Sequence, residues 1–262
     1  MVRARVSLIE LLAARFPERN AKELFSAVLR GDVTVDGERI LKPGTQLPAD
    51  AVIAVRPPRA FVSRGGEKLA RGLDEWRIDC RAAVFLDAGC STGGFTDCLL
   101  SRGAAAVFAV DVGANTLAWS LRADPRVYVR ESTNVMSLHP GDLAPEPHAA
   151  VADLSFRSLR GAAAHILGLT SRGWGIFLVK PQFEWKDPPA DFRGVVPGVE
   201  AARAIVLDLV AGLQQEGVAA WGAIASPIRG RRGNREVLVL LARQGVEPPA
   251  RPGINVEGLF AE

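Results

Sequence analysis

The amino-acid sequence predicts an α/β fold, in which a mostly parallel seven-stranded sheet carries helices on both faces and follows a small α+β domain. Two observations predict it. Near-continuous apolar segments alternate with helical ones, and the prolines and glycines of VRPPRAFVSRGG, residues 55–66, separate two units. We expect the small domain at 1–58, a linker at 59–64, the sheet domain at 65–244, and a loose tail, rich in proline and glycine, at 245–262.

The first domain is predicted from helical spacing and one hairpin signal. Apolar residues recur at helical spacing in VSLIELLAARF, 6–16, and in AKELFSAVLRG, 21–31. The alternating stretch VTVDGERI turns at Asp36-Gly37, a dipeptide typical of two-residue hairpins. These patterns predict two short helices followed by a few strands.

The second domain is predicted from its apolar strand segments and the helices between them. A helix is expected to open after Gly65-Gly66. Strands are expected at 83–89, 105–113, 126–132, 149–156, 174–181, 218–228 and 234–242. Further helices are expected at 93–102, 115–122, 157–169 and 199–216. The tight basic turn RGRRGN joins the last two strands and predicts an antiparallel pair at the end of the sheet.

Composition excludes several classes of protein. With 48% hydrophobic and 23% charged residues the chain is expected to be soluble and globular, and no apolar run reaches the ~18 residues that cross a bilayer. The N-terminus lacks a signal-peptide pattern, so a cytoplasmic protein is expected. The three cysteines show no C-x-x-C spacing and the three histidines no H-E-x-x-H pattern. Neither a disulfide framework nor a metal site is therefore expected.

The formal net charge of +3 is located in the first domain. Residues 1–62 hold ten Lys and Arg against seven Asp and Glu, whereas 63–262 hold 22 of each. A basic module beside a neutral domain favours a polyanionic partner. An ordinary solvated surface is the alternative.

The first domain also shows a resemblance to a known module. Its paired helices, followed by LRGDVTVDGERI and KPGTQL, occur in an order that resembles the RNA-binding module first seen in a small-subunit ribosomal protein and found in pseudouridine synthases and tyrosyl-tRNA synthetases. The resemblance implies that the second helix and the hairpin present basic groups to structured RNA. One departure is Arg19-Asn20, where the family often has Ser-Arg, and a small protein-docking domain is the alternative. The candidate RNA-binding residues are Arg19, Lys22, Arg30, Arg39 and Lys42.

A glycine-rich turn, LDAGCSTGGF at 86–95, follows the first strand of the second domain. It lacks the second glycine of a dinucleotide-binding G-x-G-x-x-G turn, and Phe95 stands where a P-loop needs lysine. The remaining pattern, D-x-G-x-x-x-G-G from Asp87 to Gly94, is the first motif of methyltransferases that use S-adenosylmethionine. An acidic residue suits the cationic amino-acid tail of that cofactor, and the glycines let the backbone approach it closely.

A second carboxylate supports this interpretation. Asp111 ends the next strand, where such a group accepts hydrogen bonds from ribose hydroxyls. A tight turn without a ligand is the alternative. The residues of these two segments that we expect at the cofactor are Asp87, Gly89, Ser91, Thr92, Gly93, Gly94, Phe95, Asp111 and Val112.

Four charged residues at the ends of elements predict the methyl acceptor. The Asn/Asp-Pro-Pro-Tyr/Phe cluster of amino-group methyltransferases is absent at ADLSF, and no cysteine fits methylation of a pyrimidine carbon. Asp153 and Lys180 follow strands, Glu236 lies near the start of the last strand, and Lys68 opens a helix. We expect all four at the carboxyl edge of the sheet, where such folds bind ligands.

This set suits methylation of a ribose 2′-hydroxyl, which must lose its proton as it attacks the methyl group. Burial and a second cation make a lysine a better base. We expect Lys180 to be the base, Lys68 to place the hydroxyl, and Asp153 and Glu236 to orient the two lysines. Salt bridges at strand ends are the alternative.

A resemblance over residues 60–243 rests on the stretches SRGGEKL, LDAGCSTGGFTDCLLSRGA, VFAVDVG, STNV, VADLSFRSL, LVKPQFE and GNREVLV. They are similar to the FtsJ-like ribosomal RNA 2′-O-methyltransferases of the TlyA, or haemolysin A-like, type. The resemblance implies a Rossmann-like class I methyltransferase that acts on ribosomal RNA, with the same four charged residues at the catalytic positions. It also implies that Asn134 lies near the adenine of the cofactor, and RAFV, 59–62, resembles a tetrapeptide that joins the two domains.

Two rival functions belong to other classes. The haemolysin name of the family suggests a membrane-damaging protein as one alternative. The sequence, however, shows no spanning segment, signal peptide or strongly amphipathic cationic helix. The other rival is a non-catalytic RNA-binding protein that kept the fold, and the intact charged set argues against it. The departures from the family lie in the first domain and in the loop 181–198, which we expect to close over the substrate.

Overall fold

The computed structural model describes residues 5–29, 31–56, 60–230, 232–249, 253–254 and 259. The chain forms two compact units, Met1–Arg59 and Ala60–Glu262. Arg30, one of the candidate RNA-binding residues, lies outside the described residues, as do the first residue of the expected linker and most of the expected tail beyond 249.

The first unit contains the two predicted helices, α1 (Leu8–Arg15) and α2 (Ala21–Leu29). Ser7 caps α1, because its hydroxyl accepts a hydrogen bond from the Glu10 N–H while the Glu10 carboxylate accepts from the Ser7 N–H. The apolar faces of both helices pack on short strands and form the core of this unit.

The strands of the first unit pair in two small sheets. They are β1 (Arg5–Ser7), β2 (Val33–Val35), β3 (Glu38–Arg39), β4 (Gln46–Pro48) and β5 (Ile53–Val55). β1 pairs with β4, and β2 lies between β3 and β5. Val35 pairs with Glu38, so Asp36 and Gly37 form a two-residue loop, and both have positive φ, 50° and 86°. The predicted hairpin is thereby confirmed, with a turn of type I′.

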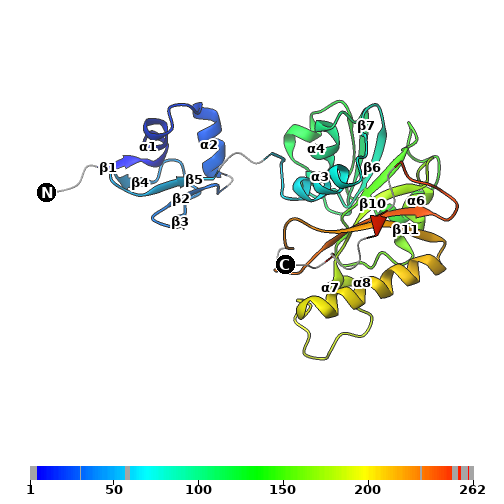
Figure 1. Cartoon of the computed structure of the whole chain (residues 1–262). Coiled ribbons are helices and arrows are strands. Elements are labelled where there is room, and N and C mark those ends of the chain that lie inside the picture. Colours follow the sequence, from blue (N-terminus) through cyan, green and yellow to red (C-terminus); the bar gives the residue numbers. More distant parts are fainter. Residues whose placement is uncertain are drawn as a thin grey trace. The chain divides into compact units, whose positions relative to one another are not determined.

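The second unit is built on one eight-stranded sheet (Figure 1). Its strands are β6 (Val84–Ala88), β7 (Ala106–Val110), β8 (Val127–Arg130), β9 (Ala149–Ala152), β10 (Trp174–Val179), β11 (Val218–Ala225), β12 (Val237–Arg243) and β13 (Gly253–Ile254). Their order across the sheet is β13-β11-β12-β10-β9-β6-β7-β8. The strands from β10 to β8 are parallel, and β12 runs antiparallel to both of its neighbours. The seven predicted strands and the Rossmann-like fold are confirmed.

The end of the chain needs a correction. β13 pairs with β11, and Leu259 is buried in the sheet core. The tail expected to be loose is therefore attached at these two places, through backbone pairing of β13 and through the buried Leu259 side chain. The edge of the sheet is formed by β13 rather than by the antiparallel pair.

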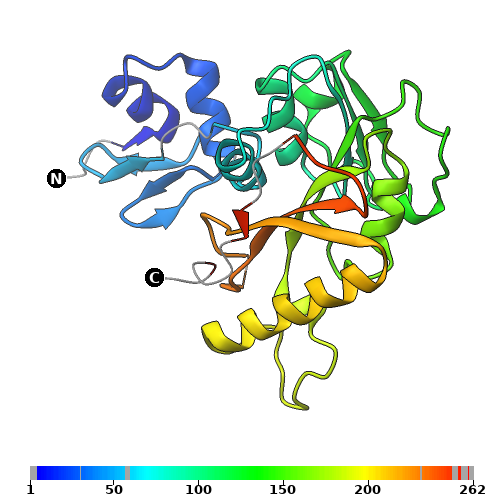
Figure 2. The same cartoon turned by 45° about the vertical axis from the view of Figure 1, so that its right-hand side comes forward.

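Helices cover both faces of this sheet (Figures 1 and 2). They are α3 (Gly65–Glu75), α4 (Gly94–Ser101), α5 (Trp119–Arg122), the 3₁₀ helix η1 (Val135–Ser137), α6 (Ala162–Gly168), α7 (Pro181–Glu184) and α8 (Gly198–Gln215). Alternate strand residues point to opposite faces. Phe85 accordingly packs with α3 and α4, whereas Leu86 packs with α6 and α8.

Two helices are shorter than the sequence predicted, because side chains capture backbone N–H groups ahead of them. α5 begins at Trp119 rather than at 115, since three preceding N–H groups donate to Glu131. α6 begins at Ala162 rather than at 157, since Glu184 accepts a hydrogen bond from the Leu159 N–H.

The segment expected to link the domains packs on the second unit. Phe61 lies against Gly66 in α3, where an added Cβ would overlap its ring. The Val62 N–H donates to the Asp97 carboxylate of α4 at 2.7 Å. These residues therefore belong to the second unit rather than to a free linker.

Candidate active site

The chain brings the expected groups to one edge of the sheet. β6, β9 and β10 are parallel neighbours, so the glycine-rich turn, Asp153 and Lys180, which follow these strands, stand at the same edge. β12 starts there too, because its Val237 pairs with Val179, the last residue of β10. Glu236 therefore reaches this edge from an antiparallel strand, in the position that the sequence predicted.

The four charged residues form two ion pairs. Lys68 Nζ lies 2.5 Å from Glu236 Oε2, and both side chains are buried. Lys180 Nζ lies 2.7 Å from Asp153 Oδ1 and donates to Ser155 Oγ at 2.8 Å. In this second pair the Asp153 side chain is 24% exposed, whereas the Lys180 side chain, at 11%, is as enclosed as that of Lys68. Ser155 was missed from the sequence, where its only signal is its place two residues after Asp153.

Aromatic side chains lie beside the pair of Lys180 and Asp153. The Lys180 ammonium lies 5.9 Å from the centre of the Phe183 ring, which in turn lies 5.3 Å from the Phe156 ring. Phe156 is 91% exposed and has a φ of +61°, which is rare for a bulky residue. An exposed aromatic ring in a strained loop beside reactive groups fits stacking on a planar ligand.

Glu184 of α7 fixes the loop that carries Phe156. Its buried carboxylate accepts from the Ser158 hydroxyl at 2.5 Å and from the Leu159 N–H at 2.9 Å. Burial raises the pKa of Glu184, although both hydrogen bonds oppose that rise. This contact could not be predicted, because Ser158 and Leu159 lie in a loop of no regular pattern.

The glycine-rich turn is strained and closely packed. Gly89, Ser91 and Gly93 have φ of +83°, +48° and +94°. A Cβ at Gly89 would lie 2.8 Å from the Asp153 carbonyl oxygen, and one at Gly93 would overlap Leu121. The turn is therefore packed against the loop of Asp153 at Gly89 and against Leu121 at Gly93, and a side chain at either glycine would displace these neighbours.

Asp87 lies fully buried beneath this turn. One carboxylate oxygen accepts from the Thr96 hydroxyl at 2.6 Å, and the other, Oδ1, has no partner among the described residues. Burial raises the pKa of Asp87 to about 7, against the effect of the Thr96 hydrogen bond. An enclosed carboxylate oxygen without a donor fits a site for a cationic group.

Asp111 is held by backbone N–H groups. It accepts from Ser91 at 2.8 Å and from Gly113 at 2.7 Å, one bond to each oxygen, which leaves each oxygen a further lone pair for a hydroxyl donor. Next to it, Val112 is 74% exposed. The Phe95 side chain, by contrast, is buried in the core, so only its backbone can face a ligand.

The other residues expected at the cofactor frame the same region. Ser91 and Thr92 are exposed at the tip of the turn, and Gly94 opens α4 behind it. Asn134 caps η1, since its side-chain oxygen accepts from the Met136 N–H at 3.0 Å. Its amide nitrogen is the group left to meet an adenine.

Glu131 organises the loop over the glycine-rich turn, and the sequence did not reveal it. Its carboxylate accepts from the N–H groups of Asn115, Thr116 and Leu117 at 2.8–3.0 Å and from Arg122 at 2.5 Å. The Arg122 guanidinium and then these N–H groups lower the pKa of Glu131 to about 2.

The thiols do not belong to this site. Cys80, Cys90 and Cys98 are free and buried. Burial raises the pKa of Cys80 to about 11 and that of Cys98 to about 12, and it raises the pKa of Cys90 further still. A protonated, enclosed thiol is a poor nucleophile. Within the described residues, no group of three or more His, Cys, Asp or Glu could hold a metal ion.

The four described candidate RNA-binding residues lie in different elements of the first unit. Lys22 lies in the first turn of α2 and Arg19 precedes it, whereas Arg39 of the hairpin packs on Gly31 just beyond its last turn. Lys42 lies in the loop between β3 and β4, which contacts α1 because the Ile9 N–H donates to the Pro43 carbonyl. Arg19 is partly buried over Phe16, and the other three side chains are exposed.

Known proteins resemble this chain over most of its length. It matches the family model of the FtsJ-like methyltransferases over residues 61–243. It is 42% identical over 229 residues to the 16S/23S rRNA (cytidine-2'-O)-methyltransferase TlyA of Mycobacterium tuberculosis, covering 86% of this chain and 84% of that one. It is 34% identical over 213 residues to Hemolysin A of Brachyspira hyodysenteriae, covering 80% of this chain and 89% of that one.

A solved structure supports the arrangement of elements. The structure of a candidate hemolysin from Streptococcus thermophilus is similar with a TM-score of 0.71 and 30% identity, over 97% of this chain and 94% of that one. Across the described part of the present chain, no helix is both long and apolar enough to span a bilayer.

Proposed function

The chain belongs to the family of FtsJ-like methyltransferases, and from this premise we propose that it transfers a methyl group from S-adenosylmethionine to a ribose 2′-hydroxyl of ribosomal RNA. The observation that carries the proposal is the pair of lysine–carboxylate contacts at the carboxyl edge of the sheet, beside the glycine-rich turn. The printed activity of the Mycobacterium tuberculosis relative supports the same acceptor.

The residues of the turn fit S-adenosylmethionine, which supplies an activated methyl group on a sulfonium when bound. Asp87 offers a buried carboxylate oxygen without a donor to a cationic amino-acid tail. Asp111 offers lone pairs to ribose hydroxyls, while Asn134 offers an amide to the adenine. No phosphate-binding feature is required of the turn, in agreement with its missing lysine.

The two ion pairs have different tasks in this reaction. Lys180, once it has released its own proton to solvent, takes the proton of the attacking hydroxyl. Asp153 then stabilises the ammonium that forms, and Ser155 fixes its direction. The buried pair of Lys68 and Glu236 is rigid, because each charge is satisfied by the other, and it places a fixed cation where negative charge develops on the ribose oxygen.

Recognition of RNA is assigned to both units. The exposed basic residues of the first unit supply phosphate contacts, which give affinity without sequence choice. Phe156 supplies a stacking surface next to Lys180, which suits a nucleotide turned out of its helix. An enzyme that modifies ribosomal RNA is expected to work in the cytoplasm.

The decisive experiment uses methyl-labelled cofactor and ribosomal RNA. The label should appear at defined nucleotides of ribosomal RNA. The modified RNA should resist alkaline cleavage at such a nucleotide, because a methylated 2′-oxygen cannot attack the neighbouring phosphate. RNA with a 2′-deoxy sugar at that nucleotide should accept no label. Methylation of the deoxy substrate at the same place would identify a base atom as the acceptor and would end the proposal.

A further inference from the structure

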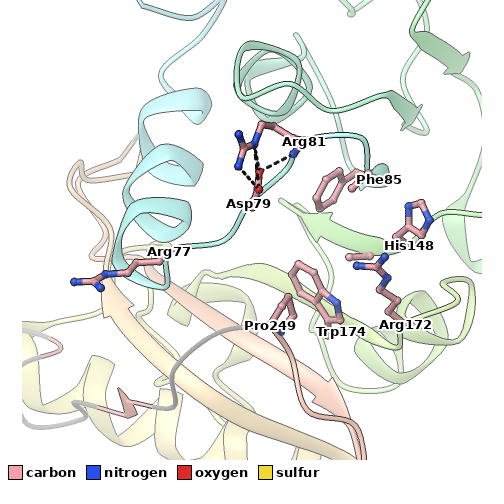
Figure 3. Close-up of a pocket in the computed structure, with 10 residues that line it drawn as sticks. Arg77, Asp79, Arg81, Phe85, His148, Arg172, Trp174 and Pro249 are labelled. Carbon is pink, nitrogen blue, oxygen red and sulfur yellow. Dashed lines mark hydrogen bonds and ion pairs between the residues drawn. The ribbon is translucent and has the colours of Figure 1, made fainter.

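A pocket lies at the opposite edge of the sheet from the candidate active site (Figure 3). Its volume is about 300 Å³, and residues at or just before the starts of β6, β9 and β10 line it. The carboxyl ends of the same three strands carry the candidate active site. The two places are therefore separated by the length of the strands, roughly 15–20 Å at about 3.3 Å per residue.

The side chains around this pocket offer donors and no spare acceptor. The Trp174 indole N–H is enclosed and has no acceptor among the described residues. His148 Nδ1 accepts from the Val84 N–H at 2.8 Å, so a neutral ring carries its proton on Nε2 and donates from there. The one carboxylate, Asp79, is already held by Arg81 through bonds of 2.8–3.1 Å.

Arg172 adds a positive charge to these donors. Within the described ranges its guanidinium has neither an ion pair nor a hydrogen bond, and its backbone N–H is used by the His148 carbonyl. Figure 3 shows its side chain between the rings of His148 and Trp174, with Phe85 across the pocket, whereas Arg77 points away. A guanidinium together with two ring N–H donors complements a compact oxyanion.

We propose that this pocket binds a phosphate group through Arg172, Trp174 and His148. The volume of the pocket is at the lower end of the range for ligand pockets. It therefore encloses the phosphate group itself and little of the molecule to which the phosphate is attached. The phosphate belongs either to an RNA backbone or to a small phosphorylated molecule. The inference is independent of the proposed function, because none of the three residues lies at the catalytic edge.

The first test follows the Trp174 indole N–H in the proton–nitrogen NMR spectrum of the full chain, with Trp174→Phe assigning its resonance. Millimolar inorganic phosphate should shift this resonance, and Arg172→Gln should abolish the shift. The matched control is Arg71→Gln in the same unit. The Arg71 side chain is half exposed and pairs with Glu75, so its loss should leave the shift intact. No shift with phosphate, or equal loss in both variants, would overturn the proposal.

The second test identifies the source of the phosphate through binding of a ribosomal RNA fragment. If the RNA backbone fills the pocket, Arg172→Gln should weaken RNA binding several-fold and lower the log–log salt slope by about 0.7–0.9, while Arg71→Gln should not. If the phosphate shift is seen but RNA affinity is unchanged, the ligand is a small phosphorylated molecule. Methyl transfer to RNA that is already saturating should be normal in Arg172→Gln in both cases.

Discussion

The buried carboxylate of Asp87 offers a sharp test of the physical reasoning. Its burial lowers the stability of the fold when the group is ionised, while it leaves one oxygen for a cationic ligand. Its pKa rises from an ordinary 3.8 to about 7 on folding. An acid whose pKa is raised in the folded state contributes stability below about pH 4, and that stability is lost as pH rises toward 7. At pH 8 the full penalty is about 4 kcal/mol, and at pH 5 it is about 2 kcal/mol.

Asp87→Asn removes the titration and keeps an oxygen for the Thr96 hydroxyl. Its new amide N–H₂ lacks an acceptor, which costs about 1–3 kcal/mol at every pH. The absolute stability of the variant is therefore less informative than its pH dependence. Relative to the parent protein, the variant should gain roughly 2–3 kcal/mol between pH 5 and pH 8.

The assay is urea denaturation of the cofactor-free chain followed by tryptophan fluorescence. All five tryptophans lie in the second unit, so the signal reports the unit that contains Asp87. The control is Asp124→Asn, since Arg126 keeps the pKa of Asp124 below its ordinary value and that residue is ionised throughout this pH range. The reasoning is refuted if Asp87→Asn and the control show the same pH dependence, or if the variant loses stability as pH rises.

Four further outcomes follow from the contacts at the site and on the first unit. Lys180→Ala and Asp153→Ala should each lower turnover by about 10²–10⁴-fold, while calorimetry shows unchanged cofactor affinity. If the loss of turnover in the double variant equals the product of the two single losses, the two residues do not act as a unit. Glu131→Gln should weaken cofactor binding several-fold and leave turnover at saturating cofactor intact, because it loosens the loop over the glycine-rich turn. An unchanged dissociation constant for the cofactor would show that this loop is not part of the site. Phe156→Ala should raise KM for RNA by about tenfold, within the 1–3 kcal/mol range of base stacking, and Phe156→Trp should restore it; failure of the tryptophan variant to do so would argue against stacking. Arg39→Gln should lower the log–log salt slope of RNA binding by about 0.7–0.9, and an unaltered slope would exclude a phosphate contact at this residue.

The main features of the fold were predictable because they depend on strong local patterns. The buried strands are almost wholly apolar, so β6, β9 and β10 could be placed, and the charges that follow them could be assigned to one edge. β12 could be oriented because a tight basic turn precedes it. By contrast, β1, β4 and β5 have three residues each, too few for a period to be recognised.

The supporting contacts of the site could not be predicted for a different reason. Glu184 meets Ser158 across 26 positions of the chain, and Glu131 meets three N–H groups 14–16 positions away. Such contacts arise only when the sheet has brought the loops together. They also shorten two helices whose composition alone favoured longer ones. Phe156 combines an exposed ring with a left-handed backbone that bulky residues rarely adopt, and no local pattern predicts either property.

The contact between Lys68 and Glu236 joins residues 168 positions apart, and this has a consequence for biosynthesis. The ribosome delivers the N-terminal lysine long before its carboxylate partner. Until β12 is inserted between β10 and β11, the nascent sheet has an unpaired edge and the lysine has no counter-charge. The buried pair of the candidate active site is thus completed only after the segment that leads into β12 has been synthesised. Incomplete chains that end before residue 236 would lack this ion pair altogether.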